Sequence, residues 1–536
     1  MFGDARMSET RAGDFREGAF GDASGARARV FGATAILGGL AAVKLVAQFA
    51  GIARYGFFRD ELYYMACGEH LAWGYVDQPP LVALVAWFER HVFGNSLASV
   101  RLLPVLAGAA VVFLTGILAR ELGARRYGQF LAASAILWAP AYFAFDSFLS
   151  MNAFEPLFWL LCAWIAVRIV KGASPKWWLA FGAVAGVALE NKHTMLVFGF
   201  ALIAGIVLAG QWRLLFSKWI WLGGAIALVL FLPNLLWEAR HGWPQIEVVR
   251  NAQLYKNIPI SPLRFLGDQI IFLSPLTLPV WLGGLAWLFV AGEGKRFRFL
   301  GWAYLIVLAV FIVLDGKSYY VLPVYPMLMA AGGVAIENLV EARQSWRWLR
   351  TTLPVLLVIG GLVALPFGVP ILPIDAFMRY SRIIPYANSV KTERDALETQ
   401  LPQLYADMFG WENVADGIAE VYRDLPAADR AGCAILAGNY GEAGAIDYYG
   451  PALGLPKAIS GHNNYFYWGP RGYTGSCVIV FGERSDEFVR YFRDVHVAAT
   501  IVSAHTMPNE HSIDVYICRD PVAPLAVLWP RFKMII

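Results

Sequence analysis

FFRDELYY at residues 57–64, continued by GYVDQPPL at residues 74–81, is the stretch around which this chain is organised. It places carboxylates among aromatic side chains in the first loop between two strongly apolar segments. Asp60 and Glu61 are adjacent at the outer mouth of a membrane bundle, where a buried charge must be paired, metal-bound or functional. Asp77 precedes two prolines, which rigidify the backbone and end any helix. We interpret this loop as the rim of an active site.

The composition is that of a membrane protein. Of the 536 residues, 58% are hydrophobic and 16% are charged, and the mean hydropathy is +0.51. These values are too apolar for an ordinary soluble protein. The formal net charge is only +4, and the basic residues are spread over short loops, which argues against a nucleic-acid-binding face.

Apolar runs long enough to cross a bilayer occur about eleven times, since a typical span needs roughly 20 residues. They lie at about 30–52, 97–119, 128–145, 152–170, 177–190, 194–209, 219–237, 269–290, 299–315, 319–340 and 352–372. The fifth and sixth runs are short, and their boundaries are the least defined. Residues 1–29 are polar, Gly-rich and basic and lack the apolar core of a signal peptide, so we expect a disordered cytoplasmic tail.

The distribution of Lys and Arg predicts the orientation, because cytoplasmic loops carry an excess of positive charge. Every second loop is basic. Eleven spans then place the N-terminus in the cytoplasm and residues 373–536 outside. The chain is thus predicted to consist of the tail, a membrane domain at residues 30–372 with a catalytic outer loop at 53–96, and an outer domain at residues 373–536.

The outer domain has a different pattern. Charge rises after residue 373, and short β-prone runs at 433–437 and 477–481 alternate with turns and with helices predicted at 393–399 and 485–494. The pattern indicates a small α/β domain. None of the five cysteines forms a C-x-x-C pair, and the sequence leaves open which of Cys433, Cys477 and Cys518 pair in a disulfide.

The catalytic candidates are in the first outer loop. We predict that Asp60 and Glu61 act as a general base or bind a metal, and that Asp77 and Gln78 hold sugar hydroxyls or the metal. The alternatives are a salt bridge between the first pair and a neighbouring arginine, and an ordinary helix stop at Asp77.

Further polar residues gather in the other outer loops. Lys192 and His193, and Lys317 with Tyr319 and Tyr320, are candidates for binding a phosphate. Their alternatives are a lysine that reaches the lipid headgroups and an aromatic belt at the membrane surface.

A third set of candidates would line the substrate cavity. It comprises Asp146, Asn152, Glu155 and His241. Glu155 has the alternative role of a carboxylate that interacts with the dipole of its own helix.

The sequence lacks several motifs of soluble enzymes. It contains no Walker motif, no H-E-x-x-H, no G-x-S-x-G and no strand-associated G-x-G-x-x-G. These absences argue against nucleotide hydrolysis and dinucleotide chemistry, so a transferred group would come from a lipid-borne donor.

The first-loop motifs resemble those of the bacterial protein-mannosyltransferase-like superfamily. These are polytopic glycosyltransferases of the C-type fold, and they include aminoarabinose and galacturonic acid transferases. The similarity extends over roughly residues 30–340 and includes NKHT at 191–194, LPN at 232–234, HGW at 241–243 and GKSYY at 316–320. NYGEAG at 439–444 and SGHNN at 460–464 resemble the tail of one bacterial subgroup. One departure is Asn152, which stands where many relatives carry an aspartate; Glu155, one turn later, is a candidate substitute.

The resemblance implies an inverting glycosyltransferase of the bacterial inner membrane. It would move a sugar from a polyprenyl-phosphate-linked donor to a periplasmic acceptor: lipid A or the lipopolysaccharide core, a glycan or a protein. Asp60 would deprotonate the acceptor or bind a metal, and Lys192, His193 or Lys317 would stabilise the leaving phosphate. Mg²⁺ or Mn²⁺ suits carboxylate ligands such as Asp60 and Asp77, although such enzymes need not depend on a metal.

Two other classes of function remain open at this stage. A transporter or flippase would be expected to carry charges at mid-membrane, broken helices and repeat symmetry. A catalytically silent, glycan-binding relative is compatible with the departure at Asn152. Changing Asp60 to Asn separates an enzyme from such a binding protein.

Overall fold

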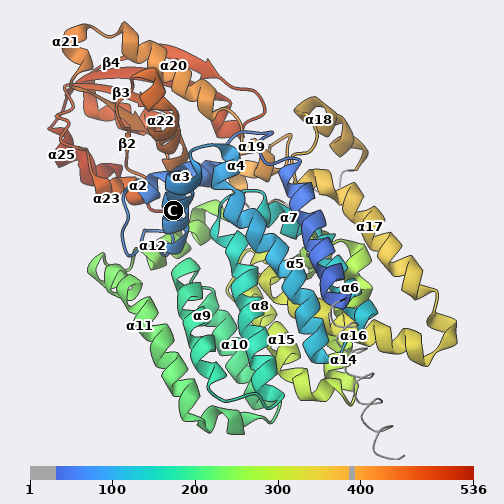
Figure 1. The fold of residues 1–536 in the computed structure, drawn as a ribbon. Coiled ribbons are helices and arrows are strands. Elements are labelled where there is room, and N and C mark those ends of the chain that lie inside the picture. The colour runs from blue at the N-terminus through green and yellow to red at the C-terminus, as the bar shows by residue number, and fades with distance from the viewer. Residues whose placement is uncertain (1–31, 385–390, 392) are drawn as a thin grey trace, which may run out of the picture.

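The larger part of the molecule is a bundle of apolar helices, and the computed structural model describes residues 32–384, 391 and 393–536 (Figure 1). The predicted tail at residues 1–29 lies outside the described residues. The bundle helices are Gly32–Phe49, α5 (Leu102–Leu122), α6 (Arg126–Leu137), α7 (Pro140–Asp146), α8 (Met151–Val170), α9 (Trp177–Asn191), α10 (Met195–Leu208), α11 (Lys218–Arg240), α13 (Pro262–Leu273), α14 (Leu278–Val290), α15 (Arg298–Val313), α16 (Tyr325–Ala342) and α17 (Leu349–Gly368).

This is a multi-pass membrane protein. Within the described residues, seven helices are long and apolar enough to span a membrane, and nine spans result if two bent helix pairs each count as one. The bends are 62° between α6 and α7 and 90° between α13 and Pro275–Val290, and a proline follows each break because it cannot continue the hydrogen-bond ladder. All eleven predicted runs fall on helices. The number eleven itself remains a prediction, because α9 has 15 residues and α10 has 14, fewer than the roughly 20 that a bilayer requires.

Helices pack closely in the bundle where small residues allow it. A Cβ atom added at Gly182 of α9 would lie 2.0 Å from the backbone oxygen of Gly223 of α11, so only glycine permits this helix crossing. The basic loops gather at one end of the bundle. Lys171 forms an ion pair of 2.6 Å with Glu121, and Arg296 donates a hydrogen bond of 2.7 Å to the carbonyl of the residue before Lys171.

A smaller domain lies at one end of the bundle, at the top of Figure 1. Its described part contains a five-stranded sheet in the order β2-β1-β3-β5-β4, in which β1 is parallel to β2 and β3, and β5 is antiparallel to β3 and β4. The strands are β1 (Cys433–Ala437), β2 (Ile459–Ser460), β3 (Cys477–Phe481), β4 (Phe492–Val502) and β5 (Ser512–Pro521). The helices are α18 (Ile374–Ile383), α19 (Gln403–Ala406), α20 (Trp411–Asp424), α21 (Ala427–Arg430), α22 (Tyr440–Leu453), α23 (Asn463–Trp468), α24 (Ser485–Phe488) and α25 (Leu525–Leu528).

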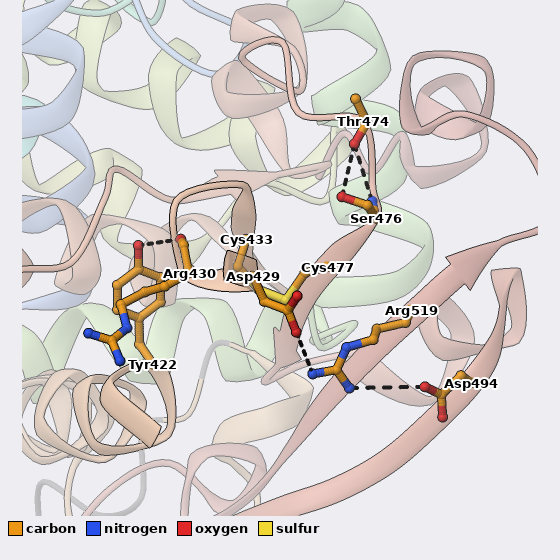
Figure 2. Close-up of a disulfide and its surroundings, with 9 residues drawn as sticks. All are labelled: Tyr422, Asp429, Arg430, Cys433, Thr474, Ser476, Cys477, Asp494 and Arg519. Carbon is orange, nitrogen blue, oxygen red and sulfur yellow. Dashed lines mark hydrogen bonds and ion pairs between the residues drawn. A yellow bond between two sulfur atoms is a disulfide. The ribbon is translucent and has the colours of Figure 1, made fainter. Parts of the chain in front are cut away.

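The predicted strands at 433–437 and 477–481 are β1 and β3, and both are fully buried. Cys433 and Cys477 are opposite each other in this parallel pair and form a disulfide (Figure 2). Cys518 on β5 is buried and free. The disulfide settles the pairing that the sequence left open.

The two helices predicted in this domain were confirmed only in part. The segment 485–494 is helical over residues 485–491, as α24 followed by a 3-10 turn, and its last three residues belong to β4, which begins at Phe492. β4 continues into VHVAATIV and pairs with β5 along its length, so tertiary pairing overrides the local helical signal. The segment 393–399 holds only a 3-10 turn at Arg394–Ala396, because so short a segment makes too few hydrogen bonds to offset helix nucleation.

Three short helices from the first outer loop connect the bundle to the sheet domain: α2 (Arg59–Glu69), α3 (Leu81–Phe93) and α4 (Leu97–Val100). Figure 1 shows α2 and α3 between the two parts. Leu62 and Tyr63 of α2 share one apolar cluster with Ala443 and Ile446 of α22. The outer loop that carries the candidate carboxylates is therefore buried between the two domains. The remaining outer helix, α12 (Pro244–Asn251), lies in the loop after α11.

Candidate active site

Glu61 is an anchor for the first outer loop and is closed to a substrate. Its side chain is 0% exposed and forms an ion pair of 2.7 Å with Arg101, which is also 0% exposed. The same carboxylate accepts backbone N–H groups of Phe58 at 2.8 Å and Leu149 at 2.9 Å. Arg101 also donates to two backbone carbonyls of the preceding loop. This geometry contradicts a catalytic role for Glu61, because no acceptor hydroxyl could reach its oxygens.

Asp60 is one residue away, and its side chain remains 29% exposed. The hydroxyl of Tyr440, at the start of α22, donates to Oδ1 of Asp60 at 2.8 Å. Arg59 Nε lies 3.9 Å from the same oxygen, and its guanidinium lies 5.5 Å from the centre of the Tyr440 ring. Oδ2 of Asp60 is the oxygen that these contacts leave for a substrate.

Asp77 is held in a similar way. The hydroxyl of Tyr63 on α2 donates to Oδ1 at 2.8 Å, and Asn463 Nδ2 lies 3.3 Å from Oδ2. The pKa of Asp77 is raised to about 6, chiefly by burial and also by the negative charge of Asp60, while the hydrogen bond from Tyr63 acts in the opposite direction. The two aspartates thus share one electrostatic environment. The structure brings them together as the sequence analysis expected, although it does not test their roles.

Gln78 and Asp146 do not face this site, which corrects their predicted substrate-binding role. Gln78 is 0% exposed, and its Nε2 points to the sulfur of Cys67 at 3.6 Å. Asp146 is buried in the bundle and pairs with Lys44 at 2.8 Å, with side-chain exposures of 3% and 0%. Lys44 lies in the first span, and its charge explains why an aspartate can be buried there.

A group of cations surrounds Glu393 next to Asp60. Lys317 Nζ lies 2.6 Å from Glu393 Oε1 and Lys256 Nζ lies 3.7 Å from it, while Arg59 Nη2 lies 3.7 Å from Oε2. Gln403 donates to Oε2 at 2.7 Å. Burial alone would raise the pKa of Glu393, but the charges of Lys256, Lys317 and Arg59 lower it well below its ordinary value. Arg59 Nε also lies 3.7 Å from Oδ1 of the buried Asp407, so Lys256 and Lys317 are the cations of this group best placed to contact a further anion.

The residues predicted around the fourth span meet in a neighbouring group. Lys192 Nζ donates to Asn152 Oδ1 and to Glu155 Oε2, each at 2.8 Å, and lies 4.3 Å from the centre of the Tyr320 ring. Tyr319 packs edge-on against Tyr320 at 4.9 Å. Asn152 and Glu155 thus bind the lysine instead of lining the cavity independently, and Glu155 neutralises the charge of Lys192. Lys192 and Lys317 thus each have a carboxylate partner, Glu155 at 2.8 Å and Glu393 at 2.6 Å.

The two histidines lie on the opposite side of the loop. His193 Nε2 is 3.0 Å from Asn234 Oδ1, and this bond joins the loop after α9 to α11. His241 is exposed and stacks on Trp237 with ring centres 4.0 Å apart, and its edge faces Tyr467 of the sheet domain at 5.5 Å. Neither histidine contacts Asp60 or Asp77.

The carboxylates offer few ligands to a divalent cation. Within residues 32–384, 391 and 393–536, no group of three or more His, Cys, Asp or Glu side chains has the arrangement of a metal site. Asp60 and Asp77 each have one oxygen bound to a tyrosine hydroxyl. A cation held here would need water or substrate oxygens for most of its ligands, as Mg²⁺ often does.

Several groups at the site were missed by the sequence analysis. Four such groups, 196 to 403 residues away from Asp60 in the chain, are Tyr440, Asn463, Lys256 and Glu393. NYGEAG and SGHNN, which contain the first two, carried a family resemblance but no assigned role. Their positions directly after β-prone runs were the available signal, because ligands of α/β sheets lie at the carboxyl ends of strands.

Known proteins resemble this chain in part of its sequence and in its fold. A family model described as dolichyl-phosphate-mannose-protein mannosyltransferase matches residues 77–237. No curated protein matches the sequence. ArnT from Cupriavidus metallidurans in the apo state has a TM-score of 0.57 at 14% identity, covering 89% of this chain and 97% of that one. Its structure bound to undecaprenyl phosphate has a TM-score of 0.58 at 15% identity over the same shares.

The archaeal oligosaccharyltransferase AglB from Archaeoglobus fulgidus, in complex with an inhibitory peptide and a dolichol-phosphate, is also similar. Its TM-score is 0.52 at 12% identity, covering 84% of this chain and 69% of that one. At these identities the likeness concerns the fold. The chain has the C-type glycosyltransferase fold with a small C-terminal sheet domain, and the family match over residues 77–237 agrees with the resemblance of the motifs in that part of the sequence.

Proposed function

We propose that this protein is a glycosyltransferase that moves a sugar from a polyprenyl-phosphate-linked donor to an acceptor hydroxyl, with inversion at the anomeric carbon. The observation that carries the proposal is the placement of two coupled aspartates, Asp60 and Asp77, beside the cations Arg59, Lys256 and Lys317. The fold supports the donor class, since ArnT of similar fold has been solved with undecaprenyl phosphate and AglB with a dolichol-phosphate.

Asp60 is the proposed general base. Its exposed Oδ2 accepts the proton of the acceptor hydroxyl as the acceptor oxygen attacks the anomeric carbon. The bond between this carbon and the phosphate oxygen breaks at the same time, and the polyprenyl phosphate leaves. Asp77, more enclosed and with a pKa raised to about 6 by burial, hydrogen-bonds the sugar or the acceptor. Two carboxylates in unequal environments can take two different roles.

The cations stabilise the negative charge that develops on the leaving phosphate. Lysine has three N–H donors, and Lys317 and Lys256 each have a single carboxylate partner in Glu393. They can therefore bind a phosphate oxygen while they keep Glu393. Such preorganised positive charge is the largest electrostatic requirement of this transition state. We further propose that catalysis needs no divalent metal, because these cations supply the charge; treatment with EDTA is expected to leave the rate unchanged.

The site is proposed to face the periplasm of a bacterial inner membrane. Two observations support this orientation. The basic loops lie at the end of the bundle opposite the sheet domain, as cytoplasmic loops would. The Cys433–Cys477 disulfide of the sheet domain suits an oxidising compartment outside the cytoplasm. The acceptor is then a molecule of the outer face of this membrane or of the periplasm, such as lipid A, a glycan or a protein.

The test is the release of polyprenyl phosphate from a panel of polyprenyl-phosphate sugars by the purified full-length protein. Wild type is expected to release it, and Asp60→Asn is expected to lose about a hundredfold or more, the range of a missing general base. Asp486→Asn is the matched control, because this aspartate of the sheet domain is 74% exposed and pairs with Arg490. Equal turnover by wild type and Asp60→Asn would exclude Asp60 as the base. No turnover by well-folded wild type with any donor would refute the enzyme and favour a glycan-binding relative.

A further inference from the structure

The sheet domain turns its carboxyl edge toward the first outer loop. β1, β2 and β3 are parallel, and the chain crosses from β1 to β2 on one side and then to β3 on the other. In open α/β sheets, this change of direction opens a crevice at the carboxyl ends of the strands, where ligands bind. Tyr440 follows β1 and Asn463 follows β2. In this protein the edge is covered by α2 and the Asp77 loop.

The residues at this edge bind the two aspartates themselves. Tyr440 donates its hydroxyl to Asp60 at 2.8 Å, and Asn463 Nδ2 lies 3.3 Å from Asp77. The next residue, Asn464, accepts the backbone N–H of Val76 at 2.8 Å. A contact that served only to join two domains could use any polar group. These contacts instead end on the two carboxylates to which we assign the chemistry.

Two tyrosine rings set the relative position of the carboxylates. The rings of Tyr440 and Tyr63 pack against each other with centres 4.7 Å apart. Tyr440 comes from the sheet domain, and its hydroxyl donates a hydrogen bond to Asp60. Tyr63 comes from α2, and its hydroxyl donates a hydrogen bond to Asp77. Both rings are buried. Because each carboxylate is bound to the tip of one ring, the ring pair determines the distance between the two carboxylates.

The backbone at Asn463 is also held in an unusual conformation. Its φ is 44°, in the left-handed region, and the residue is 0% exposed. Left-handed conformations of residues other than glycine are unfavourable and persist where the surrounding structure enforces them, often at functional sites. Here the conformation aims the amide at Asp77 while the backbone N–H of Asn463 donates to the carbonyl of Met534 at 2.9 Å.

We propose that Tyr440 and Asn463 are positioning residues, through which the sheet domain completes the catalytic site by orienting Asp60 and Asp77. The inference rests on the proposed function, and it assigns to the sheet domain a part in the chemical step itself. Tyr440 binds Oδ1 of Asp60 and turns Oδ2 toward the acceptor. Asn463 fixes Asp77 from the side opposite Tyr63.

The charged and titratable groups that act on Asp60 have to be considered in any test by pH. They come from its own helix, the Asp77 loop, the bundle and the sheet domain, and they are Arg59, Tyr64, Asp77, Tyr319, Asp407 and Tyr440. Only Tyr440 donates a hydrogen bond to the carboxylate within the described residues.

The experiment compares wild type with Tyr440→Phe, which removes the hydroxyl and keeps the ring pair. A hydrogen bond to a charged group accounts for about a tenfold to hundredfold effect, so kcat is expected to fall by this factor while the KM for the donor changes less than about twofold. The acid limb of the pH profile is expected to move up by about one pH unit. Asn463→Gly, which suits a positive φ, is expected to lower kcat in the same way without moving this limb.

The matched control is Tyr465→Phe. Tyr465 is equally buried in the sheet domain and donates a hydrogen bond of 3.0 Å to Asp447, also an aspartate of that domain. Its loss should lower the melting temperature about as much as Tyr440→Phe, with kcat and the pH profile unchanged. If Tyr440→Phe keeps the kcat and pH profile of wild type, or if Tyr465→Phe loses the same activity, the positioning role is wrong.

A second measurement does not need activity. Carbodiimide labelling of Asp60 at one fixed pH, read by mass spectrometry without substrate, reports how readily this carboxyl reacts. Tyr440→Phe removes the hydroxyl that binds Oδ1 and is expected to raise the labelling of Asp60 about twofold or more, and Tyr465→Phe to leave it unchanged. Equal labelling of wild type and Tyr440→Phe overturns the proposal. Increased labelling in Tyr440→Phe, together with a wild type that is inactive with every donor, would support the contact and refute the proposed function alone.

Discussion

Replacing Arg101 by Met tests whether Glu61 is an anchor or a catalytic group. Both side chains are 0% exposed and 2.7 Å apart. Removal of one partner from a buried ion pair destabilises a protein by about 3–5 kcal/mol, because the other charge is left buried and uncompensated. Arg101 also donates to the carbonyls of Ile52 and Gly56 at 2.9 and 2.8 Å, at about 1 kcal/mol each. We therefore expect a loss at the upper end of this range, about 5 kcal/mol.

The double variant Glu61→Gln, Arg101→Met gives the decisive comparison. It leaves no buried charge, so we expect it to recover about 2 kcal/mol or more of the loss seen with Arg101→Met alone. The assay is unfolding of the full-length protein in detergent, followed by tryptophan fluorescence, with the remaining activity normalised to the folded fraction. Glu61→Gln is expected to lower stability while the folded fraction keeps its turnover within about threefold.

Arg490→Met is the control for the removal of an arginine, because the pair between Arg490 and Asp486 is 72% and 74% exposed and such pairs are worth at most about 1 kcal/mol. The reasoning would be refuted if Arg101→Met unfolded like this control, or if the double variant were no more stable than the single one. A complete loss of turnover in well-folded Glu61→Gln would restore the catalytic role that the sequence suggested.

Three further predictions follow from buried groups. Lys44→Met leaves Asp146 unpaired inside the bundle and is expected to destabilise the protein by about 3–5 kcal/mol. Adding Asp146→Leu should restore much of this stability in the same unfolding assay. Without such a rescue, the loss of the ion pair would not be the cause of the destabilisation. The disulfide closes a sequence separation of 44 residues, and its loss is expected to lower the free energy of unfolding by about 4 kcal/mol. Cys433→Ser should therefore unfold at a lower midpoint than wild type. A reductant should lower the midpoint of wild type and leave that of Cys433→Ser unchanged. Burial raises the pKa of Asp77 from 3.8 to about 6, so the folded state binds this proton more tightly than the unfolded chain. The free energy of unfolding should therefore fall as the pH rises from about 4 to 6, by at most about 3 kcal/mol. Asp77→Asn should remove this pH dependence of stability and leave the dependence at other pH values unchanged.

The apolar runs and the first outer loop were predictable because both depend on local sequence. A membrane span needs about 20 apolar residues wherever it occurs, and β1 and β3 are short apolar runs between turn residues. The helix predicted at 485–494 ends at residue 491 and the one at 393–399 is only a 3-10 turn, because contacts with other segments decide where such short helices form. Phe492–Val502 becomes a strand only because β5 lies beside it, and that partner is not visible in the segment itself.

The centre of the candidate site was predictable and its surroundings were not. Asp60 and Asp77 were selected because carboxylates beside a membrane are costly and so point to function; their catalytic roles stay predictions. The same rule selected Glu61 and Asp146, and it failed there because each has a buried cation as partner, Arg101 at position i+40 and Lys44 about 100 residues earlier. Hydropathy and spacing do not reveal such pairs, so a sequence cannot separate a paired charge from an open one.

The position of α2 explains why the site is built from both domains. As the proposed base, Asp60 has to reach the proposed lipid-borne donor on one side and an aqueous acceptor on the other. On its own helix, Asp60 would be exposed to water, which weakens every interaction of its charge. The sheet domain covers α2 with an apolar cluster and leaves the Asp60 side chain 29% exposed, so most of the surrounding water is replaced by fixed groups such as the Tyr440 hydroxyl. Fixed dipoles in a dry site need no reorganisation when charge moves in the transition state. A bundle without this domain would keep the two aspartates in its sequence but lose the environment that makes them unequal.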